Sequence, residues 1–196
     1  MVGAGEFHKV LSEAGPSIAV ADLDRLPHDA RRYELLDGVL VVGPRETTIH
    51  QAVAGRLCGL LSGVCPDDLL VVPEPALALS AKAQFAPDLV VVPVDEVGGA
   101  KFTRPPRLVV EIRSPSTVII DLNRKKTAYE RFGVPSYWIV DPNPAGPKVT
   151  VFELRDRHYV RVAVTTARLT VERPFPFTII PAQLTSRLRV ASRQAD

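Results

Sequence analysis

Two apolar segments that each carry an acidic residue constrain the fold of this chain more than any other feature. The first, Pro87–Val92, reads Pro-Asp-Leu-Val-Val-Val, and the second, Leu108–Arg113, reads Leu-Val-Val-Glu-Ile-Arg. Short runs of β-branched residues are typical of strands buried within a sheet. An ionised carboxylate is costly to bury unless a cation meets it, so Asp88 and Glu111 predict a cation beside these strands.

If the two strands lie side by side, Asp88 and Glu111 form a site for a divalent cation. Two carboxylates, a backbone carbonyl and water molecules supply the oxygen ligands that Mg²⁺ and Mn²⁺ prefer. A metal bound there would lower the pKa of its water and neutralise charge on a phosphate, as phosphodiester cleavage requires. The two acids therefore favour a metal-dependent enzyme that acts on phosphodiesters.

The segment after Glu111 predicts a helix that carries three further candidate residues. The helix is expected from about Val118 to Phe132, with Gly133 at the C′ position. Asp121, Lys125 and Tyr129 are spaced four residues apart, so they lie along one face of it. We expect Lys125 to reach the two carboxylates and to orient or activate the attacking water.

The remaining segments predict one α/β domain with a mixed sheet flanked by helices. Asp37-Gly38 favours a two-residue turn, so residues 33–42 are expected to form an N-terminal β-hairpin. Apolar residues at helical spacing predict a helix over 48–64, with Thr47 or Thr48 as N-cap. A short helix is expected within 17–26, strands at 69–73, 76–79, 136–141 and 177–180, and a C-terminal hairpin from 148–154 and 158–164. The domain is expected to span 17–185, between a loose N-terminus (1–16) and a C-terminal tail (186–196).

Composition limits which classes of protein the chain can belong to. The chain has 196 residues, 46% of them hydrophobic and 23% charged, which is ordinary for one globular domain. A net charge of +2 excludes a polybasic arm but permits a local basic groove. Cys58 and Cys65 are too few for a disulfide framework or a zinc site, so we interpret them as reduced core residues. No apolar run resembles a signal peptide or a membrane span, and we expect a cytoplasmic protein.

Several motifs follow one another along the chain: Arg32–Gly38, His50, Pro87–Val92, Val110–Thr117, Asp121, Lys125, Tyr129 and Gly133–Pro142. In this order and spacing they resemble the Uma2 (DUF820) family of the PD-(D/E)XK restriction-endonuclease-like superfamily. The resemblance extends from about residue 20 to about residue 185. It implies a restriction-endonuclease-like mixed β-sheet flanked by helices and a nuclease site that uses Mg²⁺ or Mn²⁺.

Carried over residue by residue, the resemblance implies that Asp88 and Glu111 bind the metal. The superfamily lysine, two positions after the glutamate, is Arg113 here; arginine stays protonated and cannot act as a base, but it can contact phosphate. Displacement of the lysine onto the following helix is a variation within the superfamily, so Lys125 is assigned that role. Glu34 would add a third metal-binding carboxylate from the hairpin.

Auxiliary residues and structural alternatives stay open at this point. His50 would approach the same cleft from the first long helix, with Asp121 and Tyr129 as further auxiliary residues, although His50 also suits a structural role. In the structural alternatives, Asp88 terminates a turn, Glu111 pairs with Arg107 or Arg113, Lys125 lies on a solvated helix face and Glu34 faces solvent.

The expected function is that of an endonuclease that hydrolyses DNA. Relatives by fold often dimerise to cut two strands, so a homodimer is expected by analogy alone. One alternative is a nucleic-acid-binding or assembly module without turnover, which Arg113 and the modest net charge favour. Another is the same metal site acting on RNA or a nucleotide, because the sequence carries no base-reading motif.

Overall fold

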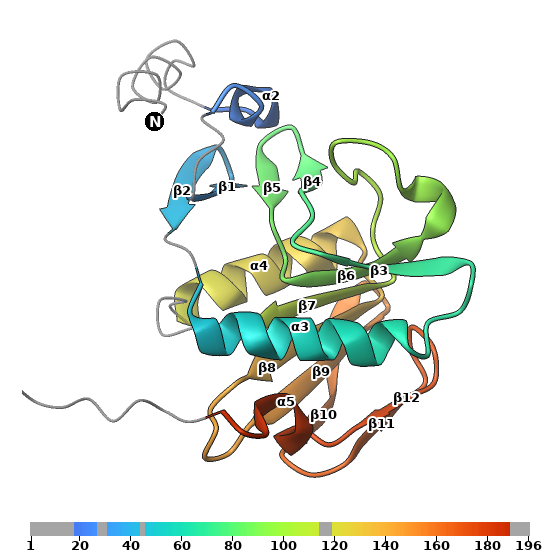
Figure 1. Ribbon diagram of the computed structural model, residues 1–196. Coiled ribbons are helices and arrows are strands. Elements are labelled where there is room, and N and C mark those ends of the chain that lie inside the picture. The colour runs from blue at the N-terminus through green and yellow to red at the C-terminus, as the bar shows by residue number, and fades with distance from the viewer. Residues whose placement is uncertain (1–17, 27–30, 44–45, 114–118, 189–196) are drawn as a thin grey trace, which may run out of the picture.

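A six-stranded mixed sheet forms the centre of the protein, as the computed structural model shows for residues 18–26, 31–43, 46–113 and 119–188 (Figure 1). Its strand order is β10-β9-β8-β7-β6-β3. The strands are β3 (Leu69–Pro73), β6 (Leu89–Pro93), β7 (Leu108–Ile112), β8 (Ser136–Asp141), β9 (Lys148–Arg155) and β10 (His158–Thr165). Strands β7 and β8 are parallel, and the other neighbours are antiparallel.

A four-stranded antiparallel sheet, with the order β2-β1-β5-β4, lies beside the central sheet. Its strands are β1 (Arg32–Leu36), β2 (Val39–Gly43), β4 (Leu77–Ser80) and β5 (Ala83–Phe85). The predicted hairpin turn is confirmed, because Asp37 and Gly38 both have positive φ angles, of 51° and 81°. A 3₁₀ helix, η1 (Val94–Glu96), follows β6.

Two long helices cover opposite faces of the central sheet. Helix α3 (Thr48–Ser62) begins after Thr47, whose side chain accepts a hydrogen bond from the backbone N–H of His50. Helix α4 (Ile119–Phe132) connects the parallel strands β7 and β8 and ends at Gly133, which has a φ of 93°. Both predicted helices and their caps are therefore confirmed.

The shorter elements complete the chain. Helix α2 (Val20–Leu23) is only part of the segment predicted as helical, and α5 (Ala182–Thr185) lies where no helix was predicted. Strands β11 (Leu169–Val171) and β12 (Phe177–Ile179) form a separate two-stranded sheet. The predicted loose N-terminus and most of the tail lie outside the described residues.

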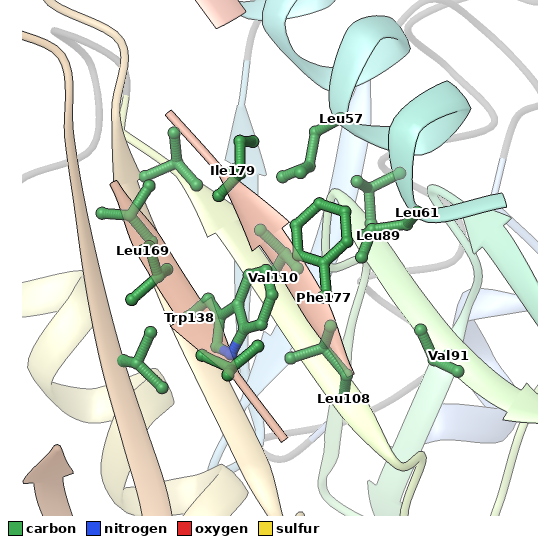
Figure 2. Close-up of a cluster of buried hydrophobic side chains, with 14 of the residues drawn as sticks. Leu57, Leu61, Leu89, Val91, Leu108, Val110, Trp138, Leu169, Phe177 and Ile179 are labelled. Atoms are coloured by element: carbon green, nitrogen blue, oxygen red, sulfur yellow. The ribbon is translucent and has the colours of Figure 1, made fainter. Parts of the chain in front are cut away.

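The main apolar core lies between α3, the central sheet and the β11–β12 sheet (Figure 2). Leu57 and Leu61 of α3 pack over the strands, and the ring of Trp138 stacks on Phe177 with centroids 5.9 Å apart. A second apolar cluster, under α4, contains Tyr129, Tyr137 and neighbouring valines. Strands β6 and β7 are thus buried on both faces, as their continuous apolar runs predicted, whereas the edge strands β3 and β10 carry exposed residues.

Two further observations concern the cysteines and the helices. Cys58 and Cys65 are both free thiols that are partly buried. None of the described helices has the length and apolar character needed to span a membrane.

Candidate active site

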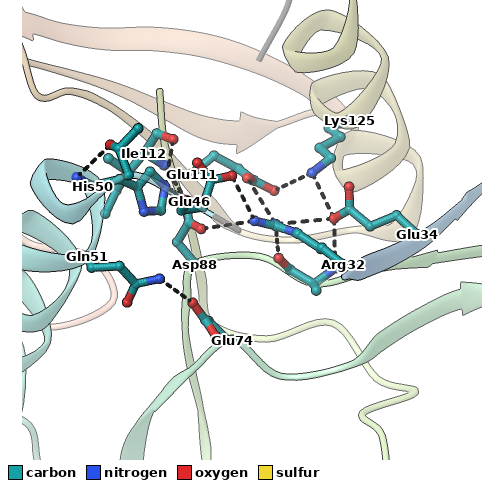
Figure 3. Close-up of polar contacts among 12 residues, drawn as sticks. Arg32, Glu34, Glu46, His50, Gln51, Glu74, Asp88, Glu111, Ile112 and Lys125 are labelled. Atoms are coloured by element: carbon teal, nitrogen blue, oxygen red, sulfur yellow. Dashed lines mark hydrogen bonds and ion pairs between the residues drawn. The ribbon is translucent and has the colours of Figure 1, made fainter. Parts of the chain in front are cut away.

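Four ionisable side chains from distant parts of the sequence meet beside the central sheet (Figure 3). Strand β1 contributes Glu34, β7 contributes Glu111, α4 contributes Lys125, and Asp88 directly precedes β6. All four are buried, with exposed fractions between 1% and 7%. Buried ionisable groups of this kind are rare unless they are paired or functional, so this group is the candidate site.

Strand pairing explains why the two predicted metal ligands are neighbours. Leu89 of β6 pairs with Val110 of β7 in antiparallel register. The same register places Asp88 opposite Glu111, one position further along each strand. The structure therefore brings together the two acids that the sequence singled out.

Asp88 is held by donors from three directions. Its Oδ2 atom accepts a hydrogen bond of 2.6 Å from the backbone N–H of Ile112 and lies 3.2 Å from Nε2 of His50. Its Oδ1 atom lies 3.4 Å from Nη1 of Arg32. Burial alone would raise the pKa of Asp88, but the hydrogen bond and charge of His50, with the charge of Arg32, lower it below its usual value. Asp88 is therefore an ionised carboxylate.

Glu111 has its two oxygens in different surroundings. Oε1 accepts a hydrogen bond of 2.7 Å from the hydroxyl of Tyr129 and lies 3.5 Å from Nζ of Lys125. Oε2 lies 4.0 Å from Nη2 of Arg32. Burial raises the pKa of Glu111 to about 7, although the charge of Lys125 opposes that shift. Oε1 therefore has the closer donors, and the raised pKa marks a carboxylate whose ionised form a further cation would stabilise.

Glu34 and Lys125 form the tightest ion pair of the site. Nζ of Lys125 donates to Oε1 of Glu34 at 2.9 Å, and the same oxygen accepts a hydrogen bond of 2.9 Å from the backbone N–H of Ala86. Burial would lower the pKa of Lys125, but the charges of Glu111 and Glu34 raise it above its usual value. The two carboxylates therefore favour the ammonium form of Lys125, which donates hydrogen bonds.

Sequence reasoning gave Arg32 no role, yet its guanidinium lies among the acids. Nη2 lies 3.2 Å from Oε1 of Glu34 and donates to the carbonyl oxygen of Ala86, while Nη1 lies 3.6 Å from Oε1 of Glu46. The available signal was its position: Arg32 and Glu34 are two residues apart on a strand and share a face.

Glu46 was also missed. It lies in the connection between β2 and α3, and its Oε2 atom is buried without a hydrogen-bond partner among the described residues. With Glu34, Asp88 and Glu111 it makes a set that we call the four site carboxylates. Arg32 and Lys125 lie within 4.0 Å of members of this set, and His50, whose charge also acts on Asp88, lies 3.2 Å from that carboxylate.

The other predicted residues are placed as follows. His50 is buried, and its Nε2 atom also lies 3.1 Å from the carbonyl oxygen of Ile112. Burial would lower the pKa of His50, but its hydrogen bond with Asp88 raises it. Tyr129 is fully buried beside Glu111. Asp121 lies in the first turn of α4, and its side chain is outside the described part of the chain.

Arg113 is not part of this group in the described structure. Its Nη1 atom forms an ion pair of 2.9 Å with Oδ2 of Asp141, at the end of β8. The pairing of Ile112 with Val140 explains this, because the next residue on each parallel strand is then Arg113 and Asp141. The guanidinium therefore lies toward β8 and not toward the two acids.

The donor set suits a hard divalent cation. Carboxylate and carbonyl oxygens are the ligands that Mg²⁺ and Mn²⁺ prefer. The four site carboxylates outnumber the three basic groups that meet them, Arg32, Lys125 and His50. One carboxylate oxygen, Oε2 of Glu46, is buried without a hydrogen-bond partner among the described residues. No three acidic, histidine or cysteine side chains in the described residues already form a ready metal-binding group. The oxygen atoms of the site therefore suit a divalent metal ion. Arg32 and Lys125 already supply positive charge to the same carboxylates.

The central mixed sheet with helices on both faces gives the protein a restriction-endonuclease-like fold. A similar fold occurs in a crystal structure described as "a putative nuclease belonging to DUF820 from Anabaena variabilis ATCC 29413", with a TM-score of 0.66. The two chains are 16% identical, and the similarity covers 79% of this chain and 89% of that one, so it bears on the fold alone.

The chain belongs to the Uma2 family. The model of that family, described as "Putative restriction endonuclease", matches residues 20–185. The resemblance read from the motifs is therefore confirmed, and so is the predicted fold class. None of the curated proteins compared with the chain matches it. Family and fold together support a nuclease.

Proposed function

We propose that this protein is a divalent-metal-dependent endonuclease that hydrolyses DNA phosphodiester bonds at Asp88 and Glu111. One observation carries the proposal: two buried acids lie opposite each other on adjacent strands, with an ammonium group 3.5 Å from the second acid. Membership of the Uma2 family and the nuclease-like fold support the same reading.

Asp88 and the Oε2 atom of Glu111 would hold Mg²⁺ or Mn²⁺, with Glu34 and Glu46 as neighbouring carboxylates. When bound, the metal supplies a water of lowered pKa and positive charge for the phosphate oxygens. The Tyr129 hydroxyl donates to Oε1 of Glu111 and Nζ of Lys125 lies 3.5 Å from it, so they would orient this carboxylate and leave Oε2 available to a cation. His50 and the backbone N–H of Ile112 orient Asp88 in the same way.

Lys125 serves this chemistry as a donor. Glu34 and Glu111 keep its ammonium group charged, so it can hold the attacking water or a phosphate oxygen by a hydrogen bond. Positive charge fixed beside a phosphate stabilises the negative charge that develops in the transition state. The role that we propose for Lys125 is therefore to orient the water and stabilise charge.

An open groove of about 600 Å³ supports a nucleic-acid substrate. It lies between the β1–β2 hairpin and α4, the elements that also carry Glu34 and Lys125. Arg124 and Arg131 line it from α4 and are exposed, while Asp37 is its acidic residue. Exposed arginines along a groove suit the phosphates of a nucleic-acid strand, and we propose that the DNA backbone lies there.

Cleavage of supercoiled plasmid tests the proposal. The wild type is expected to nick DNA with Mn²⁺ or Mg²⁺ and not with EDTA, and Asp88→Asn is expected to be inactive. Arg155→Gln is the matched control, because Arg155 pairs with Glu153 at the surface. Metal-independent nicking, or undiminished nicking by folded Asp88→Asn, would contradict the assignment.

A second candidate is a nucleic-acid-binding module without turnover, since Arg32 and Lys125 already offset part of the negative charge of the acids. Wild-type protein that binds DNA and Mn²⁺ but never nicks would favour it. A homodimer stays a prediction, which sedimentation would test.

A further inference from the structure

The position of Arg32 carries an inference that rests on the metal site proposed above. Its guanidinium lies within 4.0 Å of all four site carboxylates: Nη1 faces Asp88 and Glu46, and Nη2 faces Glu34 and Glu111. Figure 3 shows the side chain of Arg32 extending from β1 into the space between Glu34, Asp88 and Glu111. A monovalent cation of this chain thus lies where the charge of a metal ion would act.

The contacts between Arg32 and three of these carboxylates are long. Charge-assisted hydrogen bonds are typically about 2.7–2.9 Å, whereas Arg32 lies 3.4 Å from Asp88, 3.6 Å from Glu46 and 4.0 Å from Glu111. The Lys125–Glu34 pair, at 2.9 Å, shows what a tight pair in this site looks like. Arg32 is therefore shared among the four carboxylates, and only its contact with Glu34, at 3.2 Å, is shorter than 3.4 Å.

Arg32 is also the most solvent-accessible member of its pairs. Its side chain is 21% exposed, compared with 2% for Asp88 and 3% for Glu111. Its Nε atom has no hydrogen-bond partner among the described residues. Its Nη2 atom donates to the carbonyl oxygen of Ala86 and lies 3.2 Å from Glu34, so Arg32 can lose its longer contacts with Asp88 and Glu111 while these two contacts hold it on β1.

We propose that Arg32 is a resident counter-cation that competes with the divalent metal for the four site carboxylates. Without metal, its charge reduces repulsion among the acids; when metal binds, Arg32 gives up its contacts with Asp88 and Glu111. Arg32 is in this sense a positioning residue, which preserves the metal-free site and weakens its affinity for metal.

Direct measurement of Mn²⁺ binding tests the proposal. Arg32→Gln keeps a polar side chain and removes the charge, so its Mn²⁺ affinity by titration calorimetry is expected to rise at least about tenfold, or about 1.4 kcal/mol. Arg32→Lys retains a cation without the planar fork and is expected to show a smaller rise. Arg155→Gln, which removes an arginine from a surface pair, is expected to bind Mn²⁺ as the wild type does.

Thermal unfolding gives an independent readout. In EDTA, Arg32→Gln is expected to melt below the wild type, because the acids lose a counter-charge; with Mn²⁺ the difference is expected to shrink or reverse. Asp88→Asn added to either background is expected to abolish the Mn²⁺ response, which locates the binding. If Arg32→Gln does not fold, Arg32→Lys decides, and a rise in its Mn²⁺ affinity is again the expected result.

The outcomes separate this proposal from the proposed function. If the wild type binds Mn²⁺ and cleaves DNA while both Arg32 variants bind Mn²⁺ equally or more weakly, only the competition is overturned. If Arg32→Gln binds Mn²⁺ and the wild type does not, competition holds and the wild-type nuclease assignment fails. If neither protein binds Mn²⁺, both proposals are overturned.

Discussion

The two faces of the central sheet are built from the same strands but are stabilised in different ways. On the α3 face, Leu89 and Val91 of β6 and Leu108 and Val110 of β7 enter a continuous apolar core. On the α4 face, the alternate residues include valines in the middle of the strands and the two acids at their ends. Because side chains alternate along a strand, one pair of strands supplies both a hydrophobic core and a charged site.

This difference has an energetic consequence. The α3 face is stabilised by removal of apolar surface from water, which depends little on ionic conditions. The charged site on the α4 face is stable only while its charges match, because a buried charge that loses its partner is costly. Substitutions on the α3 face should therefore change stability, and substitutions among the charges should change both stability and chemistry.

The largest expected effect is the loss of cleavage in Asp88→Asn. This change keeps the side-chain volume but removes the ionised ligand, so the rate of plasmid nicking with Mn²⁺ is expected to fall by at least about 10³-fold. Circular dichroism should show a folded protein. Nicking within tenfold of the wild-type rate would mean that the acids are structural and would remove the contrast between the two faces.

Next in size is the effect of Lys125→Met, which removes the buried charge while keeping an unbranched side chain. Glu34 and Glu111 lose their partner, so metal-free stability in urea is expected to fall by about 3–5 kcal/mol. Cleavage is expected to fall as well, and Lys125→Arg should restore part of the stability. A loss below about 1 kcal/mol would show that water already screens this pair.

Leu61→Ala probes the opposite face. Leu61 is fully buried in α3, and its truncation is expected to cost about 2–5 kcal/mol of folding stability. Cleavage per folded molecule, measured well below the melting temperature, should match the wild type. A cleavage defect in the folded variant would show that the α3 core also sets the geometry of the charged site.

Tyr129→Phe tests the contribution of one hydrogen bond within the charged site. It removes only the hydroxyl that donates to Oε1 of Glu111, so stability is expected to fall by about 1.5–3 kcal/mol, the usual range for hydrogen bonds to charged groups. The Mn²⁺ affinity should fall modestly, because Glu111 loses part of its orientation. Unchanged Mn²⁺ affinity would mean that Lys125 alone orients this carboxylate.

The smallest effect is expected at the surface groove. Arg124→Gln and Arg131→Gln, each made in the Asp88→Asn background, should weaken DNA binding and reduce the salt dependence of log K by about one per lost phosphate contact. Fluorescence anisotropy at several salt concentrations measures this. An unchanged salt slope in both variants would place the DNA on another surface.

The acids and their strands were predictable because their signals are local. A buried β-branched run that contains an acid is unusual in itself, and Asp37-Gly38 and Gly133 mark a turn and a helix end by their backbone conformation. The position of Arg32 among the acids was not predictable in the same way. It depends on β1 lying beside β5, and β5 has only three residues, too few to show an alternating pattern.

Arg113 is a second residue whose contacts could not be predicted from sequence spacing. Its spacing from Glu111 matches the superfamily motif, but its partner, Asp141, lies on the next parallel strand. The register of parallel strands joined by a helix is set by packing across the sheet, which sequence spacing does not reveal. Lys125 could be placed because a regular helix fixes its position relative to Tyr129.

The attachment of the β1–β2 hairpin has a consequence for hydrogen exchange. Strand β1 carries both Arg32 and Glu34, and it pairs with β5 at a single position, Leu35 with Gln84. A local opening of this hairpin would remove one positive and one negative charge together, so the net charge around Asp88 would stay the same while its geometry was lost. Because β1 is joined to β5 at this one position, whereas β7 pairs with both β6 and β8, the backbone amides of β1 should exchange with solvent faster than those of β7. A ligand that bridges the hairpin and the central sheet should slow the exchange of the β1 amides.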